Sequence, residues 1–349
     1  MRRAIFSVVA AIILLGGGVA CIWYMGVLSA QRAFEKWADA LRVDGYEVAL
    51  GEVSVIGFPW PTGAIVGGLE IARPGDGYDW RWNARRLRVT GHPDSERITV
   101  QVLGPQQLHY LLVGERRSAS FGAQKFRMNL RRSSGGRIEQ ITVELGDFVL
   151  RLQDAEEALT ARLVKMELMR AVGAGVIPEN STVRLRIDGM VMPHKRTSPL
   201  GSTVKEFYAE AILHGQIDTL DLSRALPSWR ETSEAKLRVG AARLLWGLLS
   251  LEADGMVALD ELYRPQGLFT VRIQNFVPAL DALYAAKRIN GSARGDYYAA
   301  LLPHVQSPES QNFDTIIEFK DGNIYLLSED HGLDRITLGT LTPILQLPR

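Results

Sequence analysis

Apolar residues recur with a period of two from Tyr46 through the rest of the sequence, and this pattern limits the folds that the chain can adopt. Between Leu249 and Asp260, apolar and small residues occupy every second position, with mostly polar residues between them. Such alternation is what a sheet with one dry and one wet face requires. The same pattern recurs at Ile98/Val100/Val102, Phe126/Met128/Leu130, Val183/Leu185/Ile187, Leu237/Val239/Ala241, Phe269/Val271/Ile273 and Phe313/Thr315/Ile317/Phe319.

Turn residues separate these alternating runs, as antiparallel neighbours in a sheet require. Asp321-Gly322, between two alternating runs, is a strong hairpin signal. Further turns are predicted at Ser133-Ser134-Gly135-Gly136 and Arg264-Pro265-Gln266-Gly267. We therefore predict a mainly β protein. Its curved antiparallel multi-stranded sheet forms either an open groove or a sandwich, with a few short helices.

The segment from Ala30 to Arg42 is predicted to be an amphipathic helix that ends at Gly45. It is interpreted either as a stalk helix that packs its apolar stripe on the domain or as an interfacial or partner-binding helix. The apolar stripe is Ala30, Ala33, Phe34, Trp37 and Leu41, and the charged residues Arg32, Glu35, Lys36 and Asp39 face away from it.

Few other segments have a helical period. Pro278–Lys287 and Ser292–Leu302 are predicted helices. Ser223–Glu231 is predicted to be a short helix that Pro227 kinks or restarts. Glu156–Arg170 fits a helix by its propensities and a strand by its alternation, so periodicity leaves both open.

An uncharged run of 25 residues, Ala4 to Leu28, follows Arg2 and Arg3. At about 1.5 Å per residue, a helix of this length crosses a bilayer core of about 30 Å. The positive-inside rule places both arginines in the cytoplasm and the C-terminal bulk outside. We expect a transmembrane anchor. The alternatives are a cleaved secretory signal and a lipoprotein signal in which Cys21 is lipidated.

These segments predict a single-pass membrane protein, with a cytoplasmic N-terminus and its bulk outside the cytoplasm. The expected parts are a cytoplasmic tail at 1–3, a transmembrane anchor at 4–28, a stalk helix at 29–44 and an exported β domain at 45–349. The β domain is long enough to divide into halves at 45–220 and 221–349.

Charge and cysteine content exclude several classes of function. Without Arg2 and Arg3, the chain has 38 basic and 39 acidic residues. No basic excess is present to bind nucleic acid phosphates, so we expect no nucleic acid partner. Cys21 is the one cysteine and lies in the apolar run, which excludes disulfides, cysteine zinc sites and a cysteine nucleophile in the β domain.

Known catalytic motifs are absent from the sequence. It contains no G-x-S-x-G elbow, Walker loop, G-x-G-x-x-G or H-E-x-x-H motif. The histidines His92, His109, His194, His214, His304 and His331 include no pair at i, i+4 spacing. We therefore expect no catalytic residues, no metal, no cofactor and no enzymatic activity.

Short motifs at strand ends recur along the chain in a fixed order. They are Gly57-Phe58-Pro59-Trp60, Arg186–Pro193, Leu200-Gly201, Trp246–Leu249, Ala253–Asp260, Pro265–Val271, and Leu338-Gly339 with Pro343. In this order they resemble the domain of unknown function 2125 family, membrane-anchored proteins of alphaproteobacteria, over nearly the whole chain. The resemblance implies a single-pass anchor in the bacterial inner membrane and a periplasmic β domain. The family pattern implies a strand at Glu156–Arg170. The segment Lys320–Thr337 departs from the usual C-terminal sequence of the family by an insertion at 327–331.

The strand-turn-strand unit from Gly255 to Val271 further resembles the C-terminal repeats of AsmA-like envelope proteins. Those proteins are implicated in managing envelope lipids along a groove of curled sheet. The resemblance implies that this chain handles phospholipid or another envelope amphiphile in an apolar β groove. The alternative is an interaction or scaffold module for an envelope complex, whose protein partners the sequence does not identify.

Candidate site residues follow from these hypotheses. The candidate lipid-groove residues are Phe126, Met128, Leu249, Leu251, Ala253, Val257, Phe269, Val271 and Ile273. The candidate contacts to the membrane or a partner are Phe34, Trp37, Phe58 and Trp60. Trp60, between two prolines, is interpreted either as a plug at one end of the sheet core or as an aromatic wedge on the membrane surface.

Overall fold

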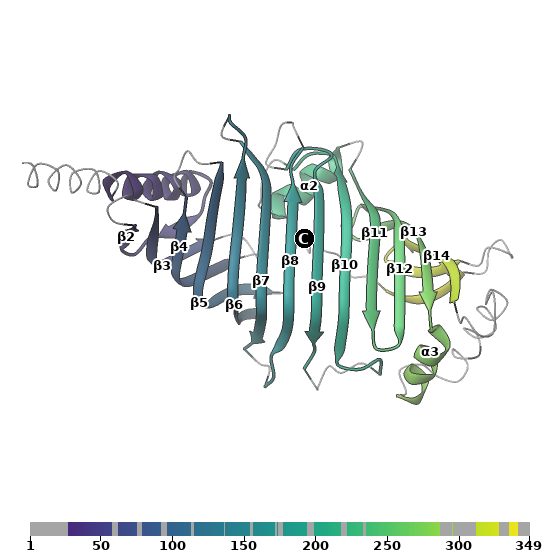
Figure 1. Ribbon diagram of the computed structural model, residues 1–349. Coiled ribbons are helices and arrows are strands. Elements are labelled where there is room, and N and C mark those ends of the chain that lie inside the picture. Colours follow the sequence, from purple (N-terminus) through teal and green to yellow (C-terminus); the bar gives the residue numbers. More distant parts are fainter. Residues whose placement is uncertain are drawn as a thin grey trace, which may run out of the picture. The chain divides into compact units, whose positions relative to one another are not determined.

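The computed structural model describes residues 27–57, 62–74, 79–91, 96–112, 115–135, 137–153, 156–171, 173, 177–193, 199–217, 222–232, 235–286, 295, 312–327 and 335–340 (Figure 1). These residues are mainly in β strands, as predicted. No helix of this part of the chain is long and apolar enough to cross a membrane. The predicted anchor lies outside the described residues, apart from its last two positions.

The chain folds into two compact units. Unit 1 contains the described residues up to Ile138, together with Leu152 and Gln153. Unit 2 contains Glu139–Arg151 and the described residues from Glu156 onward. The chain therefore passes between the two units near both ends of the strand over Ile138–Leu152, whereas the sequence suggested halves that divide at residue 220.

Unit 1 is an antiparallel sheet preceded by a helix over residues 27–43. The strand order is β1-β3-β4-β5-β6, and β2 pairs with β3 beside β1. The strands are β1 (Glu47–Ala49), β2 (Val53–Ile56), β3 (Gly63–Arg73), β4 (Trp80–Thr90), β5 (Arg97–Leu112) and β6 (Glu115–Arg132).

The helix over residues 27–43 seals one face of this sheet. Phe34, Ala38 and Leu41 form one core cluster with apolar side chains of β3, β4 and β5. Arg42 anchors the end of the helix by donating a hydrogen bond to the carbonyl oxygen of Val48 at 2.8 Å. A helix is therefore present where one was predicted, and it packs on the sheet, as in the first of the two interpretations.

The buried stripe of this helix differs from the predicted one. Ala38 is fully buried, whereas Ala33 is exposed and Trp37 is 40% exposed. Positions 34, 38 and 41 share one helical face, and only a small residue at 38 lets the helix approach the sheet. The sequence pattern placed Trp37 in the buried stripe because apolar character alone does not reveal which part of a broad stripe contacts the sheet.

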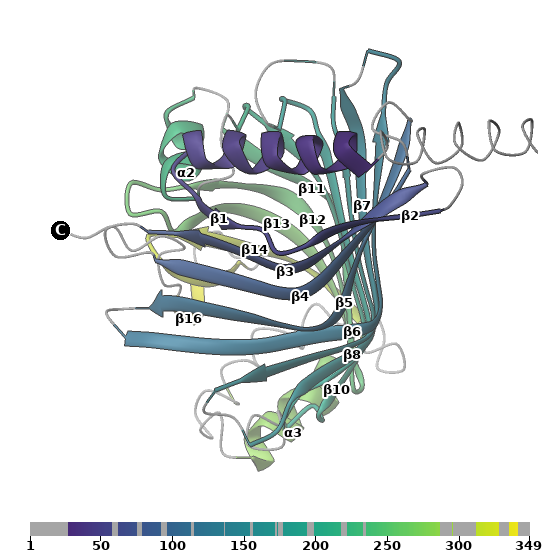
Figure 2. The same cartoon turned by 90° about the vertical axis from the view of Figure 1, so that its left-hand side faces the viewer.

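A line of irregular positions crosses the strands of unit 1 and bends them. Gly68 and Gly104 have positive φ angles of 63° and 88°, and the β4–β5 and β5–β6 registers each shift by one residue. Such bulges bend a strand and change which residues share a face. Val66 and Leu69, on either side of Gly68, are consequently both in the core. Figure 2 shows β4 and β5 bending along their length.

Unit 2 is an antiparallel sheet with strands in sequence order from β7 to β16. Helix α2 connects β10 to β11, and α3 follows β13. The elements are β7 (Ile138–Leu152), β8 (Leu159–Met169), β9 (Thr182–Val191), β10 (Thr203–His214), α2 (Leu222–Glu231), β11 (Lys236–Trp246), β12 (Leu249–Leu259), β13 (Pro265–Gln274), α3 (Phe276–Ala285), β14 (Asn312–Lys320), β15 (Asn323–Leu327) and β16 (Arg335–Thr340).

Several sequence predictions are confirmed in unit 2. The ambiguous segment Glu156–Arg170 forms strand β8, as the family resemblance implied. The Asp321-Gly322 hairpin joins β14 to β15, and both residues have positive φ, as a type I′ turn requires. Helices α2 and α3 lie within two residues of their predicted starts, and Pro227 is accommodated inside α2. The helix predicted at Ser292–Leu302 falls outside the described residues.

Two local predictions in unit 2 are wrong. The turn between β12 and β13 is formed by Asp260 to Arg264, since Asp260 accepts hydrogen bonds from the backbone N–H groups of Leu262 and Arg264. Pro265 to Gly267 belong to β13 instead. The alternating run Leu237/Val239/Ala241 is broken in β11, because a register shift after Val239 places Ala242 opposite Ala253, so Ala242 and not Ala241 continues the face of Val239. A bulge inserts one residue, and strict alternation cannot predict it.

Candidate functional site

Unit 2 has a broad apolar face, and the strand registers show which residues lie on it. Residues directly opposite in an antiparallel pair lie on the same face. In β12 and β13, Leu251 is opposite Ile273 and Ala253 is opposite Val271. The face continues across the remaining strands through the opposing pairs Phe269–Ile317, Ile317–Leu326, Leu244–Leu251, Phe207–Leu244, Ile187–Phe207, Val164–Ile187 and Leu145–Val164. We call this set, from β7 to β15, the apolar face of unit 2.

The middle of the apolar face of unit 2 is only half-buried. Leu251, Ala253 and Phe269 each keep part of their side chain accessible, and Met166 on β8, opposite Leu185, is 41% exposed. The equivalent face of unit 1 is different, because Val66 is fully buried there beneath the helix. The same alternating pattern therefore produces a sealed core in one unit and an accessible face in the other.

Helices α2 and α3 lie at opposite ends of the unit 2 strands (Figure 1). At one end, Phe276 of α3 packs against Ile273, Ile317 and Leu326. At the other end, Trp229 of α2 is 6% exposed and donates its indole N–H to the carbonyl oxygen of His214 at 2.7 Å. A helix thus packs at each end of these strands, and the half-buried part of the apolar face lies between them.

The opposite face of the unit 2 strands is polar and carries ion pairs. Arg184 and Glu210 lie 2.7 Å apart, and Arg272 holds Asp314 through two hydrogen bonds of 2.8 Å. The guanidinium of Arg184 lowers the pKa of the Glu210 carboxyl, and that of Arg272 lowers the pKa of Asp314. Further pairs are Lys165–Glu167, Arg186–Asp188 and Arg243–Glu252. The two faces of the unit 2 strands therefore differ, one carrying these ion pairs and the other apolar side chains.

The structure brings seven of the nine candidate groove residues together in unit 2. Leu249, Leu251, Ala253 and Val257 lie on β12, and Phe269, Val271 and Ile273 lie on β13. Val271 is 4% exposed, whereas the other six are half-buried. Phe126 and Met128 do not join them, because they pack against the core of unit 1.

The candidate contacts to the membrane or a partner are dispersed. Phe34 packs into the core of unit 1, and Trp37 projects from the same helix with 40% of its surface exposed. Phe58 and Trp60 lie outside the described residues, so neither interpretation of Trp60 is tested.

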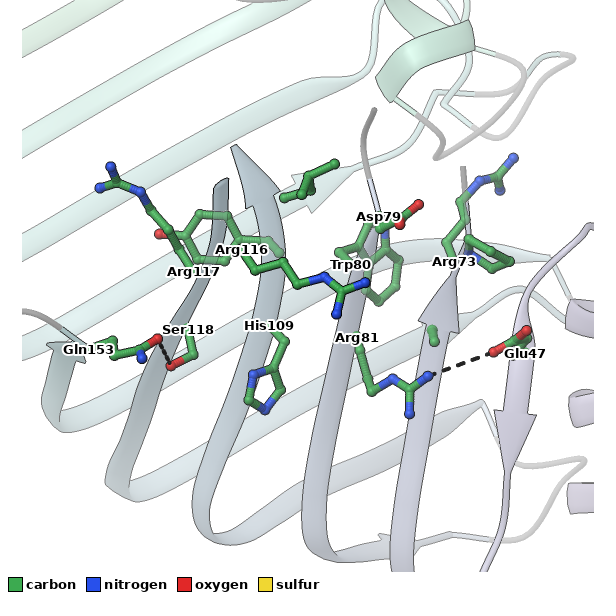
Figure 3. Close-up of a pocket in the computed structure, with 14 residues that line it drawn as sticks. Glu47, Arg73, Asp79, Trp80, Arg81, His109, Arg116, Arg117, Ser118 and Gln153 are labelled. Carbon is green, nitrogen blue, oxygen red and sulfur yellow. Dashed lines mark hydrogen bonds and ion pairs between the residues drawn. The ribbon is translucent and has the colours of Figure 1, made fainter. Parts of the chain in front are cut away.

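Sequence reasoning missed a cavity of about 480 Å³ on unit 1, whose lining includes several charged side chains (Figure 3). It lies where β3 and β5 end and β4 and β6 begin. Arg81, His109 and Ser118 stand opposite one another on β4, β5 and β6, with Arg116 two residues before Ser118 on the same face. The remaining lining residues are Glu47, Ala72, Arg73, Pro74, Asp79, Trp80, Tyr110, Leu111, Arg117 and Gln153. Alternation of polar residues predicts the wet face, but only the register aligns these side chains.

Within the described residues, no group of three or more His, Cys, Asp or Glu side chains could hold a metal ion.

Comparison with known proteins identifies the family. No curated protein and no solved structure matches the chain. The sequence model of the domain of unknown function 2125 family, described as uncharacterized proteins conserved in bacteria, matches residues 23–327. The match covers the described strands of unit 1 and those of unit 2 up to β15. The chain therefore belongs to the domain of unknown function 2125 family.

Proposed function

We propose that this protein is anchored in the bacterial inner membrane and binds the hydrocarbon part of a lipid or another envelope amphiphile on the apolar face of unit 2. The role is binding, without catalysis. One observation carries the proposal. The apolar face of unit 2 is continuous over β7 to β15 and half-buried in its middle, whereas a helix seals the corresponding face of unit 1.

The energetics favour an apolar ligand on this face. Apolar surface in contact with water costs about 25 cal/mol per Å², and contiguous exposed apolar patches often mark interaction sites. Burial of one methylene group contributes about 0.8 kcal/mol. An acyl chain that buries about ten methylenes would gain about 8 kcal/mol before the entropic cost of binding is subtracted. A flexible chain also adapts to a broad, largely apolar face.

The proposed location rests on the sequence. The uncharged run from Ala4 to Leu28 is long enough to span a bilayer, and Arg2 and Arg3 precede it. We propose a cytoplasmic N-terminus and a periplasmic location for both units. Lipids of the envelope would then be within reach of unit 2.

A scaffold role is the second candidate, and a feature of the polar face favours it. Met256 and Leu268 lie opposite each other on β12 and β13 and are 52% and 53% exposed. They form an apolar patch on the face that otherwise carries ion pairs. Such a patch suits a small contact with a protein partner.

A photo-crosslinking experiment with a matched control tests the proposal. An aromatic photo-crosslinking amino acid is introduced at Phe269 on the apolar face, or at its neighbour Leu268 on the polar face. We expect crosslinked phospholipid or another amphiphile from position 269 and none from position 268, detected by mass spectrometry after irradiation in cells. Crosslinks from 269 only to other residues of this chain would exclude lipid binding on this face. Protein crosslinks from 268 would support the scaffold role.

A further inference from the structure

The charged side chains that line the cavity on unit 1 are unevenly distributed between its two sides. On the β3–β4 side, Arg81 is paired with Glu70 at 2.8 Å and lies 4.0 Å from Glu47. On the β5–β6 side, Arg116 is exposed and makes no ion pair with any described residue. Its neighbour His109 is also exposed, and no acidic side chain among the lining residues comes from β5 or β6. The uncompensated positive charge of the cavity therefore lies at Arg116.

A hydrogen-bonded pair completes this side of the cavity. The Ser118 hydroxyl donates to Gln153 Oε1 at 2.8 Å, and the Gln153 backbone N–H donates to the Ser118 carbonyl oxygen at 2.9 Å (Figure 3). The side-chain bond uses the amide oxygen of Gln153 and leaves its NH₂ group as a donor. Gln153 is thus held beside Ser118 with a donor available.

From this arrangement we propose that the cavity binds an oxyanion, a phosphate or carboxylate group, held by Arg116 with His109 and Gln153. Guanidinium groups bind such anions through two parallel hydrogen bonds, and charge-assisted bonds of this kind are the strong ones. Side chains directly opposite on adjacent strands lie about 5 Å apart, and diagonal neighbours lie about 7–8 Å apart. His109 is opposite Ser118, and Arg116 is the diagonal neighbour of His109. The positions of Arg116, His109 and Ser118 are therefore neighbours on one face of the sheet, and Gln153 is bonded to Ser118 at its edge.

The acidic lining residues fix where the anion binds. Glu47 on β1 and Asp79 beside β4 disfavour an anion on their side of the cavity. In Figure 3 the Arg116 side chain extends from β6 into the middle of the view, whereas the guanidinium groups of Arg73 and Arg117 point outward. Arg73 stacks on the Tyr46 ring at 4.7 Å, and Arg117 is paired with Glu115 at 2.7 Å. Arg116 is thus the principal anion-binding residue.

The site lies in unit 1 and does not depend on the apolar face of unit 2. The same oxyanion chemistry could come from a phospholipid headgroup or from a soluble phosphate. Calorimetric titration of the full chain in an uncharged detergent separates these sources. One arm titrates inorganic phosphate, and the other titrates mixed micelles that contain phosphatidylglycerol, with phosphatidylcholine micelles as the reference.

Two variants make the titration decisive. Arg116→Gln removes the charge and should weaken binding at least about 10-fold, since a charge-assisted hydrogen bond is lost. Arg127→Gln is the matched control, because Arg127 lies on the same strand β6, is exposed and does not line the cavity. It should leave the affinity unchanged.

Loss of phosphate binding only in Arg116→Gln would establish a soluble anion as ligand. Loss of only the phosphatidylglycerol response would establish a headgroup. No binding in either arm, or an equal effect of Arg127→Gln, would overturn the proposal.

Discussion

Enlargement of a small side chain on the apolar face of unit 2 distinguishes an accessible face from a packed core. Ala253 lies in the middle of this face, is half-buried and stands opposite another alanine, Ala242. Ala211 lies on the same face toward the α2 end, opposite Val239, and is 8% exposed. The pair provides a test and a control within one sheet, because both substitutions, Ala253→Phe and Ala211→Phe, add the same ring.

The expected magnitudes follow from the exposure of the two sites. Overpacking a filled site costs about 1–3 kcal/mol. A domain of about 200 residues loses about 2–4 °C of melting temperature per kcal/mol, so Ala211→Phe should lower Tm by about 2–12 °C. At Ala253 the ring can extend into space above the sheet, and we expect a change of less than about 2 °C.

Differential scanning calorimetry of the two variants in detergent measures these shifts. An equal, large fall in Tm for Ala253→Phe would show that the middle of the face is packed as tightly as its α2 end. The reasoning that leads to an amphiphile on this face would then fail.

Three further predictions concern other parts of the molecule. A fusion of alkaline phosphatase to Arg349 should be active if the N-terminus is cytoplasmic, as we propose from Arg2 and Arg3; activity only of a cytoplasmic reporter would refute this topology. The pKa of Glu210 should lie below its ordinary value and rise toward it in Arg184→Gln, measured by NMR titration. Because the folded pKa is depressed, the stabilising contribution of Glu210 is present above the unfolded pKa and is lost as pH falls through the folded pKa. Ala38→Leu should lower stability by about 1–3 kcal/mol in denaturant titrations, whereas Ala33→Leu on the exposed side of the same helix should change it by less than about 0.5 kcal/mol.

The alternation of apolar residues predicted most of the strands, because the side chains of a strand necessarily alternate between its two faces. Every alternating run from Ile98 to Phe319 falls within a strand. The Asp321-Gly322 turn was predictable for a similar local reason, since few other residue pairs adopt two positive φ angles easily. Local conformational preference and local sequence suffice for such features.

The same pattern could not predict where a bulge occurs, nor in which of the two units an apolar residue lies. The inserted residue beside Ala241 depends on how β11 pairs with its two neighbours, which is a long-range property. Phe126 and Leu251 have the same alternating context in the sequence, yet one packs against the core of unit 1 and the other lies on the accessible face of unit 2.

Antiparallel strands with one apolar face, an amphipathic helix before them and a run long enough to span a membrane can all be predicted from the residues alone. Which apolar face is covered depends on the three-dimensional packing. Alternation with a period of two shows that one face of a strand is apolar. Whether that face is covered depends on which distant segment packs on it. Ala38 allows the helix to dock on unit 1, while Ala253 and its neighbours remain accessible. The cavity around Arg116 also depends on long-range pairing, since β4, β5 and β6 supply side chains to it and only their register brings those side chains together.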